Sequence, residues 1–270
     1  MKNVIILKSF KASFSKQSNI LRISLKKSDG ETFISPDIQV KKENKKFKEK
    51  EISLNMNVIN NFSKKMKISP NSLFLTSTLF TLNRFVFNRN ILISRTTESN
   101  GKLIDYPFGL FMESDKTVKE MLIEVENELI KSEEYKFFPY DKILGDNIVC
   151  PDFKYYFENK DYSSKNNYLG NNNEINSDEI NSGEINSGEI NINEINDKIN
   201  NSSNKAYLFI KSIDDEYRIS LYYNSVIYTE KLMETFIKSI EIILKKFIND
   251  QNEKIGNISI LSDKDTKKRE

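Results

Sequence analysis

The stretch DYPFGLFMESDKTVKEMLIEVENELIKSEEYKFFPYDKIL, residues 105–144, carries the pattern that decides the fold. Its apolar start ends in Gly-Leu-Phe at 109–111 and predicts a short strand. After a polar turn, Thr117 and Glu120 have the spacing of a capping box, in which each side chain satisfies a backbone N–H of the other residue. The stretch therefore predicts a strand, then a capped amphipathic helix, and then an aromatic-proline turn at 137–140.

The predicted helix places its apolar residues on one face, which comprises Val118, Met121, Leu122, Val125 and Leu129. Three glutamates, Glu124, Glu126 and Glu128, lie elsewhere on it. A metal site or an acid–base site is one interpretation of these carboxylates. The sequence supplies no histidine to complete such a cluster, which favours a solvated helix face.

Helices and strands alternate through the rest of the chain. Further helices are predicted over 57–66, 70–85 and 229–248, and strands over 91–94, 152–158, 206–213 and 217–223. Ser69 is the expected N-cap of the second of these helices, which is apolar around most of its circumference and therefore buried. The first should bury one face formed by Val58, Ile59, Phe62 and Met66. This alternation argues for an α/β sheet covered by helices.

Length and composition exclude several classes of protein. At 270 residues the chain can form one large domain or two small ones, and a net charge of +2 gives no electrostatic reason to expect nucleic acid or an anionic membrane as a partner. The single cysteine, Cys150, excludes an internal disulfide and fits a reducing compartment. No apolar run is long enough for a signal peptide or a membrane span, so we expect a cytoplasmic protein.

The absence of histidine limits the possible chemistry. It excludes Ser-His-Asp and Cys-His nucleophile systems and histidine-ligated metal sites. Any general base would have to be a carboxylate, Lys, Tyr or Cys, and these residues form no recognisable catalytic constellation. We therefore assign no catalytic residue and no metal ligand.

Two parts of the chain lie outside the alternation of predicted helices and strands. Residues 1–46 form an unassigned segment with two strand-like patches, Val4–Leu7 and Ile20–Leu25, and a mixed charged run extends from Lys41 to Lys50. We interpret that run as a solvated linker rather than a site for an anionic partner, because glutamates dilute its positive charge. Residues 166–204 contain NEINSDEINSGEINSGEINI, a five-residue repeat that predicts a disordered insertion in a surface loop.

From residue 47 to residue 265 the order of elements resembles the C-terminal half of a nonribosomal peptide synthetase condensation domain. FGLFME (108–113) is similar to the family's G-x-F-x-N strand, and FFPYDKIL (137–144) is similar to its P-F-E-x-L segment. Tyr223-Asn224 corresponds to a Y-N pair, and IGNISILSDKD (255–265) to the closing I-G-x-I-x-x-L-S-x-x-E signature. Residues 266–270 form a tail beyond the resemblance.

The resemblance implies a mixed sheet with covering helices that forms one half of a chloramphenicol acetyltransferase-like two-lobed fold. In that family two related halves pack across a tunnel, where carrier-bound acyl and aminoacyl thioesters form an amide bond. It implies four positions near this channel, Gly109, Phe111, Phe138 and Pro139. The implied partners are a peptidyl carrier protein, other synthetase domains or a separate N-terminal condensation half. The chain itself would bind no cofactor, and phosphopantetheine would be carried by the partner.

Two departures from the family change the expected function. The H-H-x-x-x-D-G motif of the N-terminal half is missing, so we expect the chain alone to be inactive in amide formation. Glu113 replaces the asparagine of G-x-F-x-N, and residues 114–116 lead almost directly into the helix. An acidic side chain facing a tunnel would be costly to desolvate unless water reaches it. Three hypotheses remain: a non-catalytic condensation half, a module that binds carrier proteins or synthetases, and a gene remnant without function.

Overall fold

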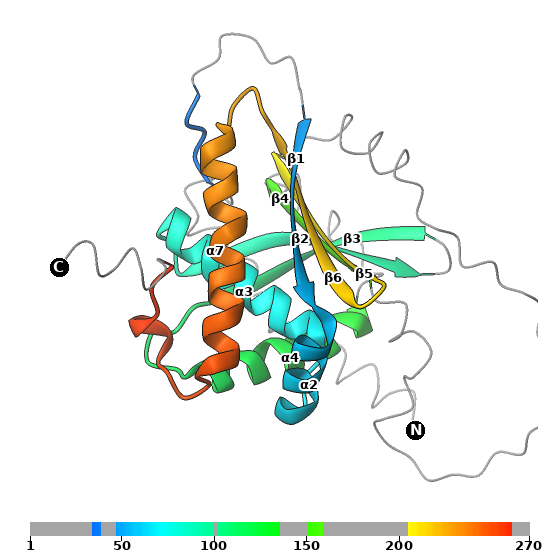
Figure 1. The fold of residues 1–270 in the computed structure, drawn as a ribbon, viewed down its shortest axis with the longest axis vertical. Coiled ribbons are helices and arrows are strands. Elements are labelled where there is room, and N and C mark those ends of the chain that lie inside the picture. Colours follow the sequence, from blue (N-terminus) through cyan, green and yellow to red (C-terminus); the bar gives the residue numbers. More distant parts are fainter. Residues whose placement is uncertain (1–33, 39–46, 100–101, 136–150, 159–204, 261–270) are drawn as a thin grey trace, which may run out of the picture.

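The computed structural model describes residues 34–38, 47–99, 102–135, 151–158 and 205–260 (Figure 1). Along the chain its elements are β1 (Phe47–Asn55), α2 (Met56–Met66), α3 (Pro70–Val86), β2 (Asn90–Ser99), β3 (Lys102–Phe111), α4 (Val118–Tyr135), β4 (Phe153–Glu158), β5 (Ala206–Ile213), β6 (Glu216–Asn224), α7 (Glu230–Asn249) and the 3-10 turn η1 (Ile255–Asn257). The predicted alternation of helices and strands is therefore confirmed.

The six strands form one mixed sheet in the order β1-β6-β5-β4-β2-β3. β1 with β6, β5 with β6, and β2 with β3 are antiparallel, whereas β4 runs parallel to both of its neighbours, β2 and β5. The mixed sheet with covering helices matches the predicted fold class.

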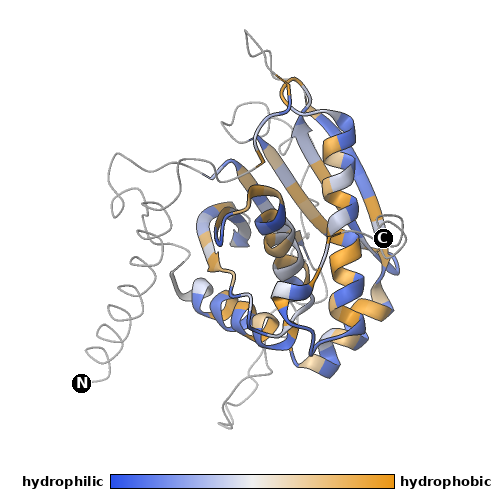
Figure 2. Ribbon diagram, turned by 90° about the vertical axis from the view of Figure 1, so that its left-hand side faces the viewer, coloured by the Kyte–Doolittle hydropathy of each residue, from blue (hydrophilic) through white to orange (hydrophobic). Residues whose placement is uncertain are grey.

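The helices gather on one side of this sheet (Figure 1). α7 is amphipathic, and it buries Met233, Phe236, Ile237, Ile240, Ile243, Leu244 and Phe247. In Figure 2 apolar residues, drawn in orange, occur along α7 and along the strands beside it. On the same side, β6 contributes the alternate residues Tyr217, Ile219, Leu221 and Tyr223. Burial of these two apolar surfaces against each other forms the main core.

Helix α3 lies inside this core, and all of its residues from Ser72 to Leu82 are buried. Four of its hydroxyl groups are satisfied within the helix, because each donates to the carbonyl four residues earlier. Thr76, Ser77, Thr78 and Thr81 make these bonds at 2.6–2.8 Å. A helix with polar side chains can therefore be enclosed by apolar residues without leaving these hydroxyls unpaired.

The N-terminus of α3 is capped by two residues. Ser69 accepts a bond from the N–H of Ser72, as predicted for an N-cap. Glu126 of α4 accepts from the N–H of Ser69 at 2.8 Å, from its hydroxyl at 2.7 Å, and from the hydroxyl of Ser72. A carboxylate at this position also interacts favourably with the helix dipole. Glu126 was predicted to lie on a solvated face, and this was wrong because α4 packs beside the start of α3.

We expect Glu126→Ala to destabilise the fold by about 1–3 kcal/mol, because three donors at a part-buried helix end lose their acceptor. The measurement is urea unfolding followed by circular dichroism. Glu128→Ala is the matched control, since it removes an equal charge whose partner is Lys131 at the surface. Equal destabilisation by the two variants would contradict this role for Glu126.

The other end of α3 is joined to the end of the described chain. The guanidinium of Arg84 donates to the carbonyls of Ile255 at 2.8 Å and Ile258 at 3.2 Å. The N–H of Gly256 donates to the carbonyl of Ser114 at 2.8 Å. The segment that resembles the family's closing signature thus connects α3 to the turn before α4.

Gly256 is required by this close approach. A Cβ atom at this position would lie 2.9 Å from the carbonyl oxygen of Ser114, a backbone atom that cannot move aside as the end of a side chain would. We expect Gly256→Ala to lower the free energy of unfolding by about 1–3 kcal/mol, the usual range for overpacking. Thermal unfolding tests this, with the exposed neighbour substitution Asn257→Ala as control. An unchanged melting temperature for Gly256→Ala would refute the argument.

Three predictions need correction. The charged run from Lys41 to Lys50 is not all linker, because residues 47–50 belong to β1. This strand is half polar yet stable in the sheet, since it pairs along its whole length with β6 and Lys50 bonds to Glu230 of α7. Val58 is 53% exposed, and the buried residues of α2 are Ile59, Phe62 and Ser63, with Met66 packed against the core. The strand predicted at 91–94 is longer, because its hairpin partner β3 pairs with all of β2.

Some predictions fall outside the described residues. These are the strand-like patches Val4–Leu7 and Ile20–Leu25, the aromatic-proline turn at 137–140 and the repeat at 166–204. They stay predictions, as do the proposed domain boundaries.

Candidate interaction site: the aromatic face of the sheet

The sheet has a second apolar cluster on the side opposite the main core. It consists of Tyr156, Tyr207 and Phe209, with Phe47, Leu103 and Tyr222 partly buried against it. All six residues come from strands, and side chains of alternate residues point to opposite faces of a sheet. We call these six residues the aromatic face.

The rings of this face are in contact with one another. Tyr207 and Phe209 are stacked with their centroids 6.3 Å apart, and Phe209 meets Tyr156 at 5.9 Å and Tyr222 at 5.5 Å edge to face. Phe47 extends the group toward β1, with its centroid 6.2 Å from that of Tyr207. Edge-to-face and offset pairs of this kind add to the stabilisation from buried area.

The aromatic face is more buried than the exposed side of an antiparallel sheet usually is. Tyr156 and Tyr207 are each only 4% exposed, and Phe209 is 8% exposed. Within the part of the chain that the structure describes, no helix contributes to this cluster. A six-residue apolar surface of this kind is typical of a sheet face that packs against another layer.

Charged side chains surround the aromatic centre and pair with one another. Lys154 bonds to Asp105, which also accepts from the hydroxyl of Thr96 at 2.7 Å. The ammonium group of Lys154 lies 5.7 Å from the centroid of the Tyr207 ring, a cation–π distance. Two further pairs, Lys211–Glu158 at 3.7 Å and Arg218–Glu51 at 3.4 Å, complete the border.

Burial changes the acidity of the tyrosines on this face. It raises the pKa of the Tyr156 and Tyr207 hydroxyls well above the usual value near 10, and nearby carboxylates raise it further. For Tyr156 these carboxylates belong to Glu158 and Glu98. Both phenols therefore stay neutral in the folded chain at a pH where an unfolded chain would ionise them.

This difference predicts a loss of stability at alkaline pH. Above pH 10 the unfolded state releases a proton from Tyr156 and the folded state does not, so the free energy of unfolding falls as pH rises. Tyr156→Phe removes one such proton and should make this fall shallower by up to about 1.4 kcal/mol per pH unit. Urea unfolding between pH 8 and pH 11 measures both slopes. At pH 8 residue 156 is neutral in the parent chain and in the variant, whether folded or unfolded, so the stabilities at this pH are the reference. Identical slopes for the two proteins would contradict the raised pKa of Tyr156.

Two of the four predicted channel residues lie on the same side of the sheet as the aromatic face. In the β2–β3 hairpin Gly109 pairs with Leu92 and Phe111 pairs with Asn90. Both share the alternation of Leu103, which packs in the aromatic cluster, whereas Phe108 and Leu110 face the main core. Phe111 is 44% exposed, a large apolar side chain at the end of β3. Phe138 and Pro139 fall outside the described residues.

The aromatic residues themselves were not predicted as site residues. The sequence does contain a signal for them, because Tyr207 and Phe209 alternate with Leu208 and Ile210 in β5. Apolar residues on both faces of a strand indicate a strand covered on both sides. In β6, however, the residues on this side are Arg218, Ser220 and Tyr222, and this mainly polar set obscures the pattern.

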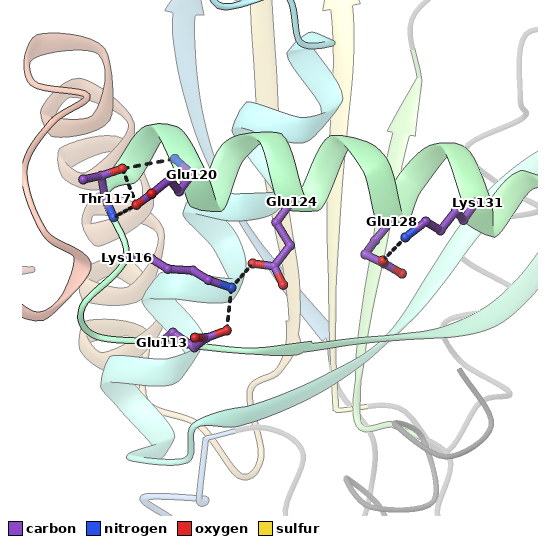
Figure 3. A network of polar contacts seen from close by, with 7 residues as sticks. All are labelled: Glu113, Lys116, Thr117, Glu120, Glu124, Glu128 and Lys131. Atoms are coloured by element: carbon purple, nitrogen blue, oxygen red, sulfur yellow. Dashed lines mark hydrogen bonds and ion pairs between the residues drawn. The ribbon is translucent and has the colours of Figure 1, made fainter. Parts of the chain in front are cut away.

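Glu113 at the end of β3 is turned toward α4 (Figure 3). Its carboxylate pairs with Lys116, whose ammonium group also lies 2.7 Å from Glu124. The Glu113 side chain is 39% exposed, so the acidic replacement in the motif remains in contact with water and has an ion-pair partner. The desolvation expected for a carboxylate facing a tunnel therefore does not arise.

The turn after Lys116 contains the predicted capping box (Figure 3). The N–H of Thr117 donates to the carboxylate of Glu120 at 2.8 Å, and the N–H of Glu120 donates to the Thr117 hydroxyl at 3.2 Å. The Thr117 hydroxyl also donates to the Glu120 carboxylate, at 2.8 Å, and the two bonds that Thr117 donates to this carboxylate lower the pKa of Glu120. The start of α4 was thus predicted correctly from local chemistry.

The ranges that the structure describes hold neither a metal-binding cluster nor a membrane-spanning helix. There, no group of three or more Cys, Asp or Glu residues is placed to hold a metal ion. In the same ranges no helix is both long and apolar enough to cross a membrane.

Comparisons of sequence find no match: no family model and no curated protein is similar to this chain. Comparison of structures finds several matches. The X-domain in the complex of the X-domain and OxyB from teicoplanin biosynthesis matches at a TM-score of 0.65 and 11% identity. The condensation domain from the monacolin K polyketide synthase MokA matches at 0.59 and 13%, and the epimerization domain of tyrocidine synthetase B, TycB3(E), at 0.57 and 15%.

These matches cover nearly all of this chain and little more than half of the other chain. The share of this chain is 93% for the X-domain and the condensation domain and 90% for the epimerization domain. The share of the solved chain is 56%, 62% and 59%, respectively. At such low identity the likeness shows the fold, and we conclude that this chain has the fold of part of a condensation domain.

Proposed function

We propose that this chain is one half of a condensation-type assembly, inactive alone, and that it binds a second, histidine-bearing lobe across the aromatic face. The observation that carries the proposal is the aromatic face itself, with Phe111 on the same side of the sheet. The chain also spans little more than half of the solved chains that it resembles in structure.

The composition of the face suits an obligate type of contact. The cores of such interfaces are apolar and rich in aromatic residues, with charged residues at the rim. Here the rings of Tyr156, Tyr207 and Phe209 are surrounded by ion pairs such as Lys154–Asp105. A lobe that docks here would cover the exposed side chain of Phe111 and the partly buried side chains of Phe47, Leu103 and Tyr222.

The division of roles follows from residue types. The chain has no histidine, so a histidine base for amide formation would come from the other lobe, encoded on the same polypeptide or on a second chain. This half would supply the opposite wall of the channel. Phosphopantetheine would enter with a carrier protein and would need no dedicated site here.

The test uses a purified histidine-bearing N-terminal condensation half as the titrant and calorimetry as the measurement. We expect Phe111→Glu to weaken binding at least about tenfold, because a charge replaces an apolar side chain in the contact. Ile130→Glu is the matched control, since Ile130 is 47% exposed on α4, away from the sheet. Equal weakening by both variants, or no binding by the parent chain, would contradict the proposal.

A second candidate is a module that recruits other proteins without chemistry. It is favoured by one structural neighbour, an X-domain solved in complex with OxyB. Titration with a phosphopantetheinylated carrier protein, followed by an assay for amide product in the presence of both lobes, separates the two. Binding without product supports the recruiting module, and product formation supports the condensation half.

A further inference from the structure

We propose that two copies of this chain associate through helix α2, antiparallel to each other about a two-fold axis at Asn61. The acidic turn between β5 and β6 of each copy would meet the basic end of α2 of the other copy. This inference goes beyond the proposed function, because it uses α2 and the β5–β6 turn instead of the aromatic face. Two charge clusters of opposite sign, an exposed helix face and the symmetry that relates them support it.

The C-terminal end of α2 carries three exposed lysines, Lys64, Lys65 and Lys67. The lysines that form ion pairs in the described ranges, such as Lys50 and Lys154, belong to other elements. Lys67 has a left-handed backbone, with φ at 57°, in a C-cap position where glycine is the usual residue. The third positive charge of this cluster is therefore held at a cost in backbone strain.

Negative charge gathers at the other end of the same helix. Asp214, Asp215 and Glu216 are exposed where β5 turns into β6. The N–H of Met56, the first residue of α2, donates to the carbonyl of Asp215 at 2.9 Å, and Asn55 pairs with Glu216 in the sheet. Among the described residues these three carboxylates form no ion pair. The acidic turn is therefore fixed at the N-terminal end of α2.

Between the two clusters α2 presents one exposed face, at the end of the sheet where β1 ends and β6 begins (Figure 1). The exposed residues have the spacing of a single helical face and are Asn57, Val58, Asn61, Lys64 and Lys65. Val58 is 53% exposed, whereas Ile59 and Phe62 on the other side of the helix are packed in the main core. The core therefore holds α2 in place while its outer face stays open to a partner.

Two-fold symmetry makes this surface complementary to itself. In an antiparallel pair centred on Asn61, Val58 would face Lys64, and Asn55 beside the acidic turn would face Lys67. Each contact occurs twice in such an interface, so opposite charges would meet at both ends and Val58 would pack on aliphatic lysine stems. A parallel pair would instead bring the two lysine clusters together, and their repulsion disfavours it.

The expected dimer is weak and sensitive to salt. α2 has 11 residues and is about 16 Å long, so one helix and one turn from each copy form a contact at the small end of the range for specific interfaces. Much of the attraction comes from exposed charges, which salt screens. We therefore expect a monomer–dimer equilibrium that shifts toward monomer as the salt concentration rises.

The test is sedimentation velocity of the full chain over a range of concentrations. Lys64→Glu/Lys65→Glu should raise the dissociation constant of the dimer at least about tenfold, because like charges then meet at both ends of the contact. Asp215→Lys/Glu216→Lys should do the same, and it leaves the left-handed Asp214 in place. An equimolar mixture of the two variants should restore the dimer, since each acidic cluster again faces a basic one.

Two further variants separate association from stability. Lys231→Glu/Lys254→Glu changes the net charge by the same amount at exposed lysines outside α2 and should leave the dimer unchanged. Charges at the ends of α2 also interact with its dipole, and urea unfolding measures that effect separately. Lys67→Gly should keep the fold about as stable, because glycine suits a left-handed C-cap, and should still weaken the dimer.

Several results would overturn the inference. These are a parent chain that forms no dimer at any concentration, equal weakening by the control, and a mixture of folded variants that fails to restore the dimer. The last result would show that the charges act on α2 itself and not between copies.

An engineered disulfide provides an independent measurement. In a Cys150→Ser background, Asn61→Cys should form an intermolecular disulfide faster than Asn249→Cys, because the two-fold axis brings the two thiols at position 61 together. Equal rates of disulfide formation would refute the proposed axis. No partner lobe is present in these experiments, so their outcome is separate from that of the proposed function.

Discussion

The enclosure of α3 is the constraint on which the rest of the structure depends. A helix surrounded by apolar side chains has no water to satisfy its ends, so other elements must supply the bonding groups. α4 contributes Glu126 at the N-terminus, and η1 with its neighbour contributes the carbonyls that accept from Arg84 near the C-terminus. Helix packing, the turn before α4 and the closing segment are therefore linked through one buried element.

Local chemistry in the sequence was enough to locate most elements. The capping residues Ser69 and Thr117 predicted where α3 and α4 begin, because a helix start depends on groups within about four residues. The composition of the charged strand β1 did not predict a strand, since this element is stabilised by pairing with β6, far along the chain. The role of Glu126 depends in the same way on how two helices cross.

The candidate site was harder to predict for the same physical reason. Gly109 and Phe111 were identified from a motif, and both lie on the aromatic side of the sheet. Tyr207 and Phe209 share β5, but Tyr156 lies in β4, which becomes the neighbour of β5 only when the sheet forms, so no local pattern connects Tyr156 with them. The sequence pattern predicted a buried side for each strand. It could not show which residues on the opposite side of the strands would come together as the aromatic face.

The pairing of β1 with β6 has a consequence for how the protein is made. In chain order β1 is the first strand of this sheet and its partner β6 is the last. β1 must therefore stay unpaired while most of the polypeptide is synthesised. A waiting strand is a template for association with other nascent chains. The alternating charges of Lys48, Glu49, Lys50 and Glu51 oppose such association, because any partner strand would have to match them. The polarity of β1 therefore protects the chain before the sheet closes.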